Sequence, residues 1–265
     1  MNALALYRRL IGVAIRSEML YPSSFLLRFG SQFVVTIIEF GGIYVLFERF
    51  KHIRGWGFAE VALFYAVASI AFALADALSR GFDSMGPMLI KTGNFDRVLL
   101  RPRGSVLQIV GREIFLSSAG RLLQGLVALV VAVGLLKLDW SVGDGLLLAW
   151  AVAGGTSLFF SLKMMEGVLS FWTTEGLEVA NTLTYGGEAA AQFPLDIYTA
   201  WFRKLLLYGV PIGCSLYLPV ALVLGHDTGA PAWLAVLAPL TGFAFLGVAA
   251  AFWRFGIGHY TSTGS

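Results

Sequence analysis

The sequence has few of the residues that build disulfides and metal centres. Its single cysteine, Cys214, excludes an intrachain disulfide and a four-cysteine metal site. The three histidines, His52, His226 and His259, lie far apart, and no HExxH or CxxC motif is near them. The sequence therefore predicts no metal site, and each histidine is expected to be an interfacial or loop residue.

A nucleotide-binding loop is also missing. A P-loop needs Gly-x-x-x-x-Gly-Lys-Ser/Thr, because backbone amides surround the phosphates and the lysine reaches the outer ones. None of the lysines follows a glycine, and Lys91-Thr92, which has the final dipeptide, is preceded by Ile90. The chain is therefore not expected to bind ATP by this device.

Charged side chains are scarce, at 13% of the 265 residues, whereas 57% are hydrophobic. Ordinary soluble domains contain about 25% charged residues. The mean hydropathy is +0.76, and the apolar residues form runs close to the ~20 residues that a helix needs to cross a bilayer. A net charge of +3 does not indicate a nucleic-acid partner. These properties predict an integral membrane protein surrounded by lipid.

The apolar runs predict an all-α polytopic fold with six transmembrane helices in a single domain, 1–265. The third run is longer than a bilayer requires, so a tilted or projecting helix is expected there. Before the first run, apolar residues at helical spacing alternate with arginines, which favours an interfacial helix over residues 1–20; a cytoplasmic extension of the first span is the alternative. The predicted spans are residues 29–47, 58–78, 106–136, 146–172, 205–224 and 233–253.

The distribution of lysine and arginine predicts the orientation. With a cytoplasmic N-terminus, most basic residues fall before the first span, around 79–105 and around 166–204. Both termini and both of these segments are then expected in the cytoplasm. The connections on the other side are too short for an extracellular domain.

Ionisable side chains and prolines inside the spans are candidates for the translocation path, because both are costly there. Glu39 lies mid-span and either faces a substrate or hydrogen-bonds to a neighbouring helix. Pro211 and Pro219 interrupt the fifth span. These three residues are the path candidates.

Charged residues near the ends of the spans are expected to pair within their own helix. Asp76 and Arg80 are four residues apart, and Lys163 and Glu166 are three apart. Both spacings place the side chains on one helical face. A local ion pair is therefore predicted at each place.

The segment RGFDSMGPMLIKTGNFDRVLLRPRGS, residues 80–105, is a polar island between two apolar runs. It contains an apolar stripe at helical spacing, Phe82, Met85, Met88 and Leu89, which Gly86-Pro87 interrupts. Gly93 permits a turn, and Pro102 ends any helix. A short amphipathic helix of this kind can dock in a groove of a partner. A solvated loop that only sets topology is the alternative.

GNFDRVLLRP resembles the G-x-x-D-x-x-L-x-R-P signature in the cytoplasmic loop of permease subunits of ATP-binding-cassette exporters, in a six-span branch of the type-2 (ABC-2) class. RGWGFAEVALFYAV, LSFWTTEGLEVAN and FPLDIYTAWFRKLLLYGVPIGCSLYLPVALVLG resemble further segments of that branch, in the same order. The likeness covers roughly residues 20 to 260. Phe193 and Asn94 depart from it, since tyrosine and an acidic residue are commoner there.

The resemblance implies a permease subunit in a bacterial inner membrane, without catalytic residues or a cofactor of its own. It would work with a second permease, identical or homologous, and with two copies of a cytoplasmic ATPase that binds ATP and Mg. The loop 79–105 would contain the coupling helix that docks on the ATPase. The implied coupling residues are Phe82, Met85, Leu89, Gly93, Asp96, Arg97, Arg101 and Pro102.

Two other function classes stay open from the residues alone. A polytopic membrane enzyme that acts on lipids could use intramembrane carboxylates such as Glu39, Asp76 or Glu166. An ion-driven carrier would transport its substrate without ATP. The apolar and aromatic spans suit a lipid-like or amphipathic substrate in each case.

Overall fold

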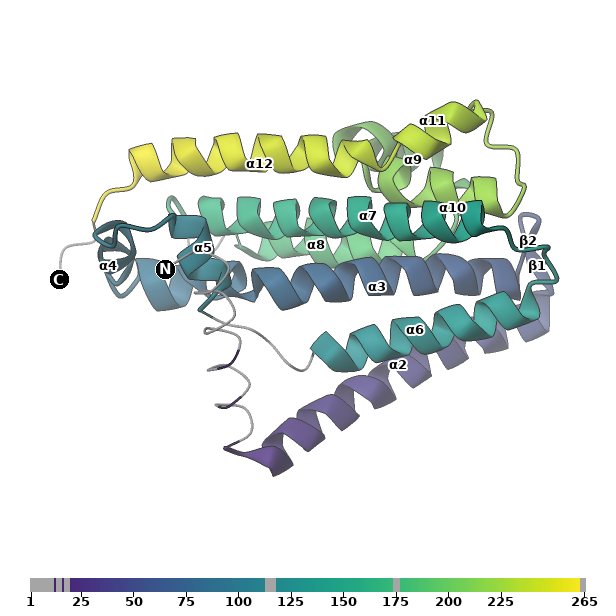
Figure 1. Cartoon of the computed structure of the whole chain (residues 1–265), viewed down its shortest axis with the longest axis horizontal. Coiled ribbons are helices and arrows are strands. Elements are labelled where there is room, and N and C mark those ends of the chain that lie inside the picture. Colours follow the sequence, from purple (N-terminus) through teal and green to yellow (C-terminus); the bar gives the residue numbers. More distant parts are fainter. Residues whose placement is uncertain (1–11, 13–15, 17–19, 113–117, 174–176, 263–265) are drawn as a thin grey trace.

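A computed structural model describes residues 12, 16, 20–112, 118–173 and 177–262, and these residues are predominantly helical (Figure 1). The predicted all-α class is therefore confirmed. The expected interfacial helix, 1–20, falls mostly outside the described residues. The helices are α2 (Pro22–Phe50), α3 (Phe58–Asp83), α4 (Phe95–Leu99), α5 (Ser105–Val110), α6 (Ser118–Leu135), α7 (Val142–Leu169), α8 (Leu177–Ala191), α9 (Ala200–Lys204), α10 (Leu218–Val223), α11 (Ala232–Leu237) and α12 (Leu240–His259).

A short antiparallel hairpin, β1 (His52–Ile53) and β2 (Trp56–Gly57), joins α2 to α3. Arg54 and Gly55 form its two-residue loop with positive φ angles of 50° and 90°. Such loops suit the twist of a hairpin, and glycine enters this region without steric cost. The side of the molecule that carries this hairpin is called the hairpin end, and the opposite side, where α4 lies, the α4 end (Figure 1).

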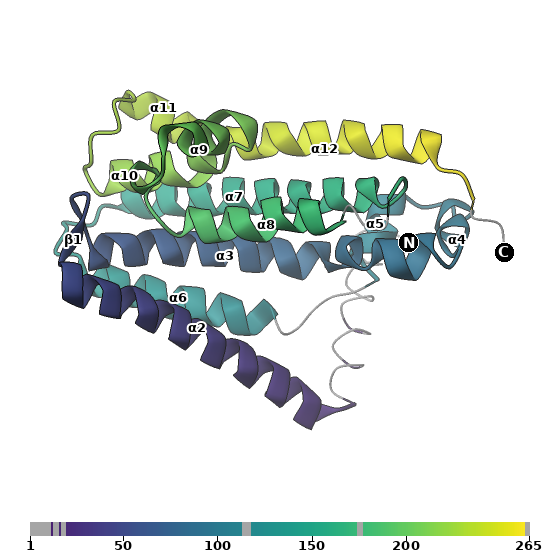
Figure 2. The ribbon, with the colours of Figure 1, turned by 180° about the vertical axis from the view of Figure 1, so that it is seen from behind.

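Helix α3 lies at the centre of the bundle, with α7 and α8 on one side and α6 and α2 on the other (Figures 1 and 2). Most of its residues are buried, because alanines let its neighbours approach closely. Glycines make other close contacts: a Cβ on Gly125 of α6 would lie 2.7 Å from Ile70 of α3. Helix α12 packs on the far side of α7, where Gly154 and Gly242 bring the two backbones together.

Four stretches of the described residues are helical and apolar enough to cross a membrane: 58–90, 118–135, 142–169 and 240–259. A bent helix pair would be a fifth if it formed one crossing. The six predicted crossings therefore stay a prediction. Helix α7 starts at Val142 because Ser141 and Asp144 cap it reciprocally, with Asp144 N donating to Ser141 Oγ over 3.1 Å.

Two predicted spans differ from the structure. The third, 106–136, is not one long helix: α5 ends at Val110, Gly111 and Arg112 form a turn, and α6 covers Ser118–Leu135. Residues 113–117 lie outside the described residues. The sixth, 233–253, is divided into α11 and α12 at Pro239, which has no N–H to continue a helix, and α12 continues to His259.

The sequence predicts 79–105 and 166–204 on the same side, but the structure brings only the first part of 166–204 to the end where α4 lies. Helix α8 runs beside α7 and returns the chain toward the hairpin end (Figure 2). There Arg54 of the hairpin donates to the backbone carbonyl of Asp196 over 2.6 Å. Arg203 pairs with the Asp196 carboxylate at 3.3 Å. Residues 196–204 therefore lie opposite α4, because a helix hidden in the predicted polar segment reverses the chain.

Candidate functional site at the α4 end

The polar island of the sequence, residues 80–105, forms a compact helical segment at the α4 end, which is called the α4 segment. Helix α3 passes into a π-helical turn over Gly86–Ile90, so Gly86-Pro87 does not break it as the sequence suggests. Pro87 lies in the first turn, where its missing N–H is tolerated. Gly93 then has a φ of 66°, which confirms the predicted turn. Helix α4 follows, and Pro102 lies in the exposed loop before α5.

Three of the four residues of the predicted apolar stripe face the interior of the chain, whereas Met88 faces outward. Phe82, Met85 and Leu89 are 0–1% exposed. The ring of Phe82 lies 5.5 Å from that of Trp253 on α12, and Gly167 of α7 leaves room for the same side chain. Direct contact of these three side chains with an ATPase, as the resemblance implies, therefore disagrees with their burial. They attach the segment to α7 and α12 instead.

The outward face of the segment carries Met88 together with residues outside the stripe. Pro87, Met88, Lys91 and Thr92 are exposed, and Met88 is 55% exposed. Methionine is unbranched and polarisable, which suits it to contact surfaces that must adapt. This group, called the Pro87–Thr92 face, is the apolar-and-basic surface that the π-helical turn Gly86–Ile90 and the residues after it present outward.

Asp96 ties α4 to the end of the chain, since Ser262 Oγ donates to its Oδ2 over 2.6 Å. The neighbouring Phe95 is buried, with its ring 5.0 Å from those of both Phe171 and Tyr260. Arg97 of α4 and Arg101, just after α4, are exposed. The structure therefore divides the predicted coupling residues into an attached set and an exposed basic set.

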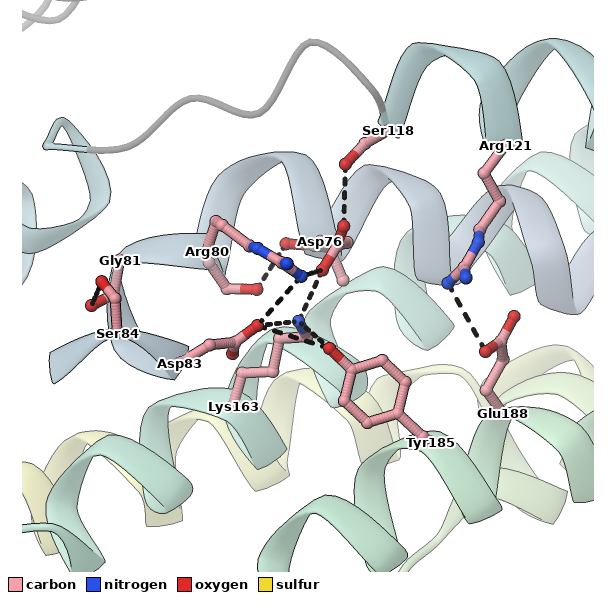
Figure 3. Close-up of polar contacts among 12 residues, drawn as sticks. Asp76, Arg80, Gly81, Asp83, Ser84, Ser118, Arg121, Lys163, Tyr185 and Glu188 are labelled. Carbon is pink, nitrogen blue, oxygen red and sulfur yellow. Dashed lines mark hydrogen bonds and ion pairs between the residues drawn. The ribbon is translucent and has the colours of Figure 1, made fainter. Parts of the chain in front are cut away.

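Behind this segment lies a buried charge cluster (Figure 3). Lys163 of α7 is 0% exposed and donates to Asp76 Oδ1 over 2.5 Å and to Asp83 Oδ2 over 2.8 Å. Arg80 lies 3.5 Å and 3.4 Å from the same two carboxylates. The local Asp76–Arg80 pair is thus confirmed. The local Lys163–Glu166 pair is wrong, because Lys163 points across to α3.

The cluster connects four helices. Ser118 of α6 donates to Asp76 Oδ2 over 2.7 Å, and Tyr185 of α8 lies 3.4 Å from both Lys163 Nζ and Asp83 Oδ2. Two cations thus balance two carboxylates in the interior. Buried ion pairs add little net stability over apolar packing, but breaking one is strongly destabilising. The cluster therefore specifies how α3, α6, α7 and α8 fit together beside the α4 segment.

Arg121 of α6, to which the sequence assigned no partner, pairs with Glu188 of α8 at 3.6 Å and lies over the ring of Phe72 (Figure 3). Glu166 is 2% exposed, and its Oε2 has no hydrogen bond within the described part of the chain. Glu39 is exposed on α2. The three intramembrane carboxylates named for an enzyme, Glu39, Asp76 and Glu166, are not brought together as one constellation.

At the hairpin end, Pro211 lies at a sharp bend. Residues 200–209 and 213–223 form two helical pieces bent by 86°. Val210 is extended, with φ −119° and ψ 99°, because the residue before a proline avoids the helical region. Pro219 lies inside α10, after a π-helical turn over Gly213–Tyr217. The predicted interruption is thus present at Pro211, whereas Pro219 leaves α10 intact.

The bent pair is held to the hairpin by Asp196. Tyr217 donates to its Oδ2 over 2.7 Å, in addition to the contacts with Arg54 and Arg203. His226 stacks on Trp56 of the hairpin with ring centroids 3.8 Å apart. This cluster was not predicted, because its members are distant in sequence.

A bundle of apolar helices, with one polar segment packed across their ends, defines an integral membrane protein. A family model described as ABC-2 family transporter protein matches residues 33–264. The chain therefore belongs to the ABC-2 transporter family, and it is a permease component of an ABC transporter. No curated protein and no solved structure matches the chain.

Proposed function

We propose that the chain is the permease subunit of an ATP-driven exporter in a bacterial inner membrane. It forms the translocation path with a second permease, identical or homologous, and two copies of a cytoplasmic ATPase supply the energy and hold the ATP and Mg. The substrate is lipid-like or amphipathic. Six crossings are made by α2, α3, α6, α7, α8 and α12, and the bent pair is a re-entrant element at the extracellular hairpin end.

The observation that carries this proposal is the attachment of the α4 segment to the spans. Phe82, Met85 and Leu89 are part of a buried cluster with residues of α7 and α12, such as Val168 and Trp253. A segment packed in this way moves together with the helices that hold it, since close-packed interiors transmit strain. A displacement applied to the Pro87–Thr92 face is therefore passed to α3, α7 and α12.

The buried charge cluster lies on the same route. Asp83 is at the end of α3, next to the buried stripe, and Asp76 is two turns further into the membrane. Lys163 and Tyr185 connect these carboxylates to α7 and α8. A force on the α4 segment thus reaches a polar junction of four helices rather than a single span.

The translocation path is proposed beside α2. Glu39 is exposed there among exposed apolar side chains that include Val35 and Ile38. A carboxylate facing lipid is costly. The face of α2 with Glu39 is therefore assigned to the second permease and the path between the two subunits, with Pro211 and Pro219 in the bent pair as further path candidates.

The test is copurification of the ATPase with Met88→Asp. A charge on the Pro87–Thr92 face is expected to remove most ATPase binding while membrane insertion and thermal stability stay unchanged, because Met88 packs little within the chain. Met88→Leu is the matched control and is expected to bind normally. Full ATPase binding by Met88→Asp would contradict the docking face, and substrate transport that persists without ATP would contradict the exporter.

A further inference from the structure

A cavity of about 330 Å³ opens at the α4 end between α4 and the end of α5. Three arginines line it, Arg97 and Arg101 from the α4 side and Arg112 after α5, together with Asn94 and Val98. The wall is fixed from behind, because Gln108 of α5 donates to the carbonyl of Val98 over 3.0 Å. The three guanidinium groups are therefore gathered at one opening by the packing of α4 on α5.

Within the described residues, none of these three arginines has an ion-pair partner. Asp96, the acidic residue nearest in sequence to Arg97, instead accepts a hydrogen bond from Ser262. Arginine presents planar forks of N–H donors that match the oxygens of a phosphate. The opening thus has the charge and the donors for a phosphate group, and no anion among the described residues occupies them.

Exposed aromatic side chains lie at the same end of the bundle as the opening. Trp172 and Phe255 are exposed at the α4 ends of α7 and α12, with ring centroids 6.0 Å apart. Exposed aromatic side chains of this kind mark the headgroup level of a bilayer. Helix α4 is at the same level, because Phe95 packs against Phe171, which precedes Trp172.

Exposed apolar side chains adjoin the arginines. Leu99 and Leu100, between Arg97 and Arg101 in sequence, are 41% and 83% exposed. Basic groups beside exposed leucines are the combination by which segments lie in an interface, with the leucines in the acyl boundary and the cations at the headgroups. A purely protein-facing basic site would not need leucines this exposed.

We infer that the cavity lined by Arg97, Arg101 and Arg112 binds the phosphate of an anionic phospholipid. The lipid holds α4 against the membrane on the side away from the Pro87–Thr92 face. The inference does not depend on the proposed ATPase contact, because the two surfaces use different residues. A failure of the lipid site can therefore be distinguished from a failure of the proposed ATPase contact at the Pro87–Thr92 face.

The test measures lipid affinity of the full chain in neutral detergent by native mass spectrometry, with phosphatidylglycerol and phosphatidylcholine as probes. Arg97→Gln/Arg101→Gln is expected to bind phosphatidylglycerol roughly 25-fold more weakly, since each basic group near an anionic lipid surface contributes about a factor of five. Arg254→Gln, which removes an exposed cation at the same end but outside the cavity, is the control and is expected to change little.

Arg112→Gln is a second variant that leaves α4 untouched, and about a fivefold loss is expected from it. Unchanged thermal unfolding of each variant shows that the loss is not due to misfolding. Equal phosphatidylglycerol affinity in all variants, or a loss as large with Arg254→Gln, would overturn the site. Inorganic phosphate that competes as strongly as the lipid would also overturn the site. Arginine variants that lose ATPase copurification while their lipid binding is unchanged would overturn it as well.

Discussion

Replacing Lys163 by methionine removes the cation closest to Asp76 and Asp83 while nearly keeping the side-chain volume. In the structure the four charges of Asp76, Arg80, Asp83 and Lys163 balance, and Lys163 is fully buried. After the change, Arg80 alone faces two carboxylates at distances of 3.4 and 3.5 Å. One negative charge is then uncompensated in the interior.

The expected cost is about 3 to 5 kcal/mol, the usual result of removing one partner from a buried ion pair. At roughly 2–4 °C per kcal/mol for a chain of this size, the midpoint of thermal unfolding in detergent should fall by about 10 °C. Lys137→Met is the matched control, because Lys137 is exposed between α6 and α7. Its expected effect is within about 0.5 kcal/mol.

A second change separates charge from packing. Asp83 has one buried oxygen, Oδ1, without a hydrogen bond in the described part of the chain, so Asp83→Asn removes the least supported negative charge. Lys163→Met/Asp83→Asn restores the balance of charge and should be more stable than Lys163→Met alone. Equal unfolding midpoints for Lys163→Met and Lys137→Met would refute the reasoning, and so would a further loss in the double variant.

Two further predictions concern packing and the subunit arrangement. Gly81→Ala places a Cβ against the carbonyl oxygen of Ile109, so α5 must shift and the midpoint of thermal unfolding should fall by several degrees. Gly104→Ala, which has nothing within 4 Å of its new Cβ, is the control and should leave the midpoint unchanged. Equal midpoints for the two variants would contradict the close contact of α3 and α5. In a Cys214→Ser background, Glu39→Cys should form oxidative cross-links to a second permease, whereas Val248→Cys, exposed on α12 at the opposite side of the bundle, should not (Figure 1). Cross-linking at Val248 but not at Glu39 would place the second permease on the wrong side for this proposal.

The α4 segment shows where sequence reasoning succeeded and where it failed. Gly93 and Pro102 act locally, and the turn at Gly93 is where the residue type predicts it. The stripe of Phe82, Met85, Met88 and Leu89 was correctly recognised as apolar and helical, but three of its four side chains face the interior and Met88 alone of the four faces outward. Periodicity shows that one face of a helix is apolar, and it does not show whether that face meets a partner or the same chain.

Helix α8 shows a different limit of the sequence. The segment 177–191 contains polar residues such as Thr184, Tyr185 and Glu188, so its hydropathy did not predict a helix of the bundle there. Two of these polar groups are used inside the bundle, Tyr185 in the Lys163 cluster and Glu188 with Arg121. The apolar run 205–224, in contrast, contains the bend at Pro211.

The sequence by itself determined the properties that depend on composition and short range: a membrane-embedded all-α chain, its main apolar helices, the turn at Gly93 and the pair of Asp76 with Arg80. Only the tertiary structure decided which distant groups meet. Lys163 bonds to Asp83 of α3 rather than to Glu166 one turn away, and Arg97 and Arg101 meet Arg112 at one opening. The reason is physical: a buried charge takes the partner that the packed interior brings closest, and sequence spacing does not give that distance.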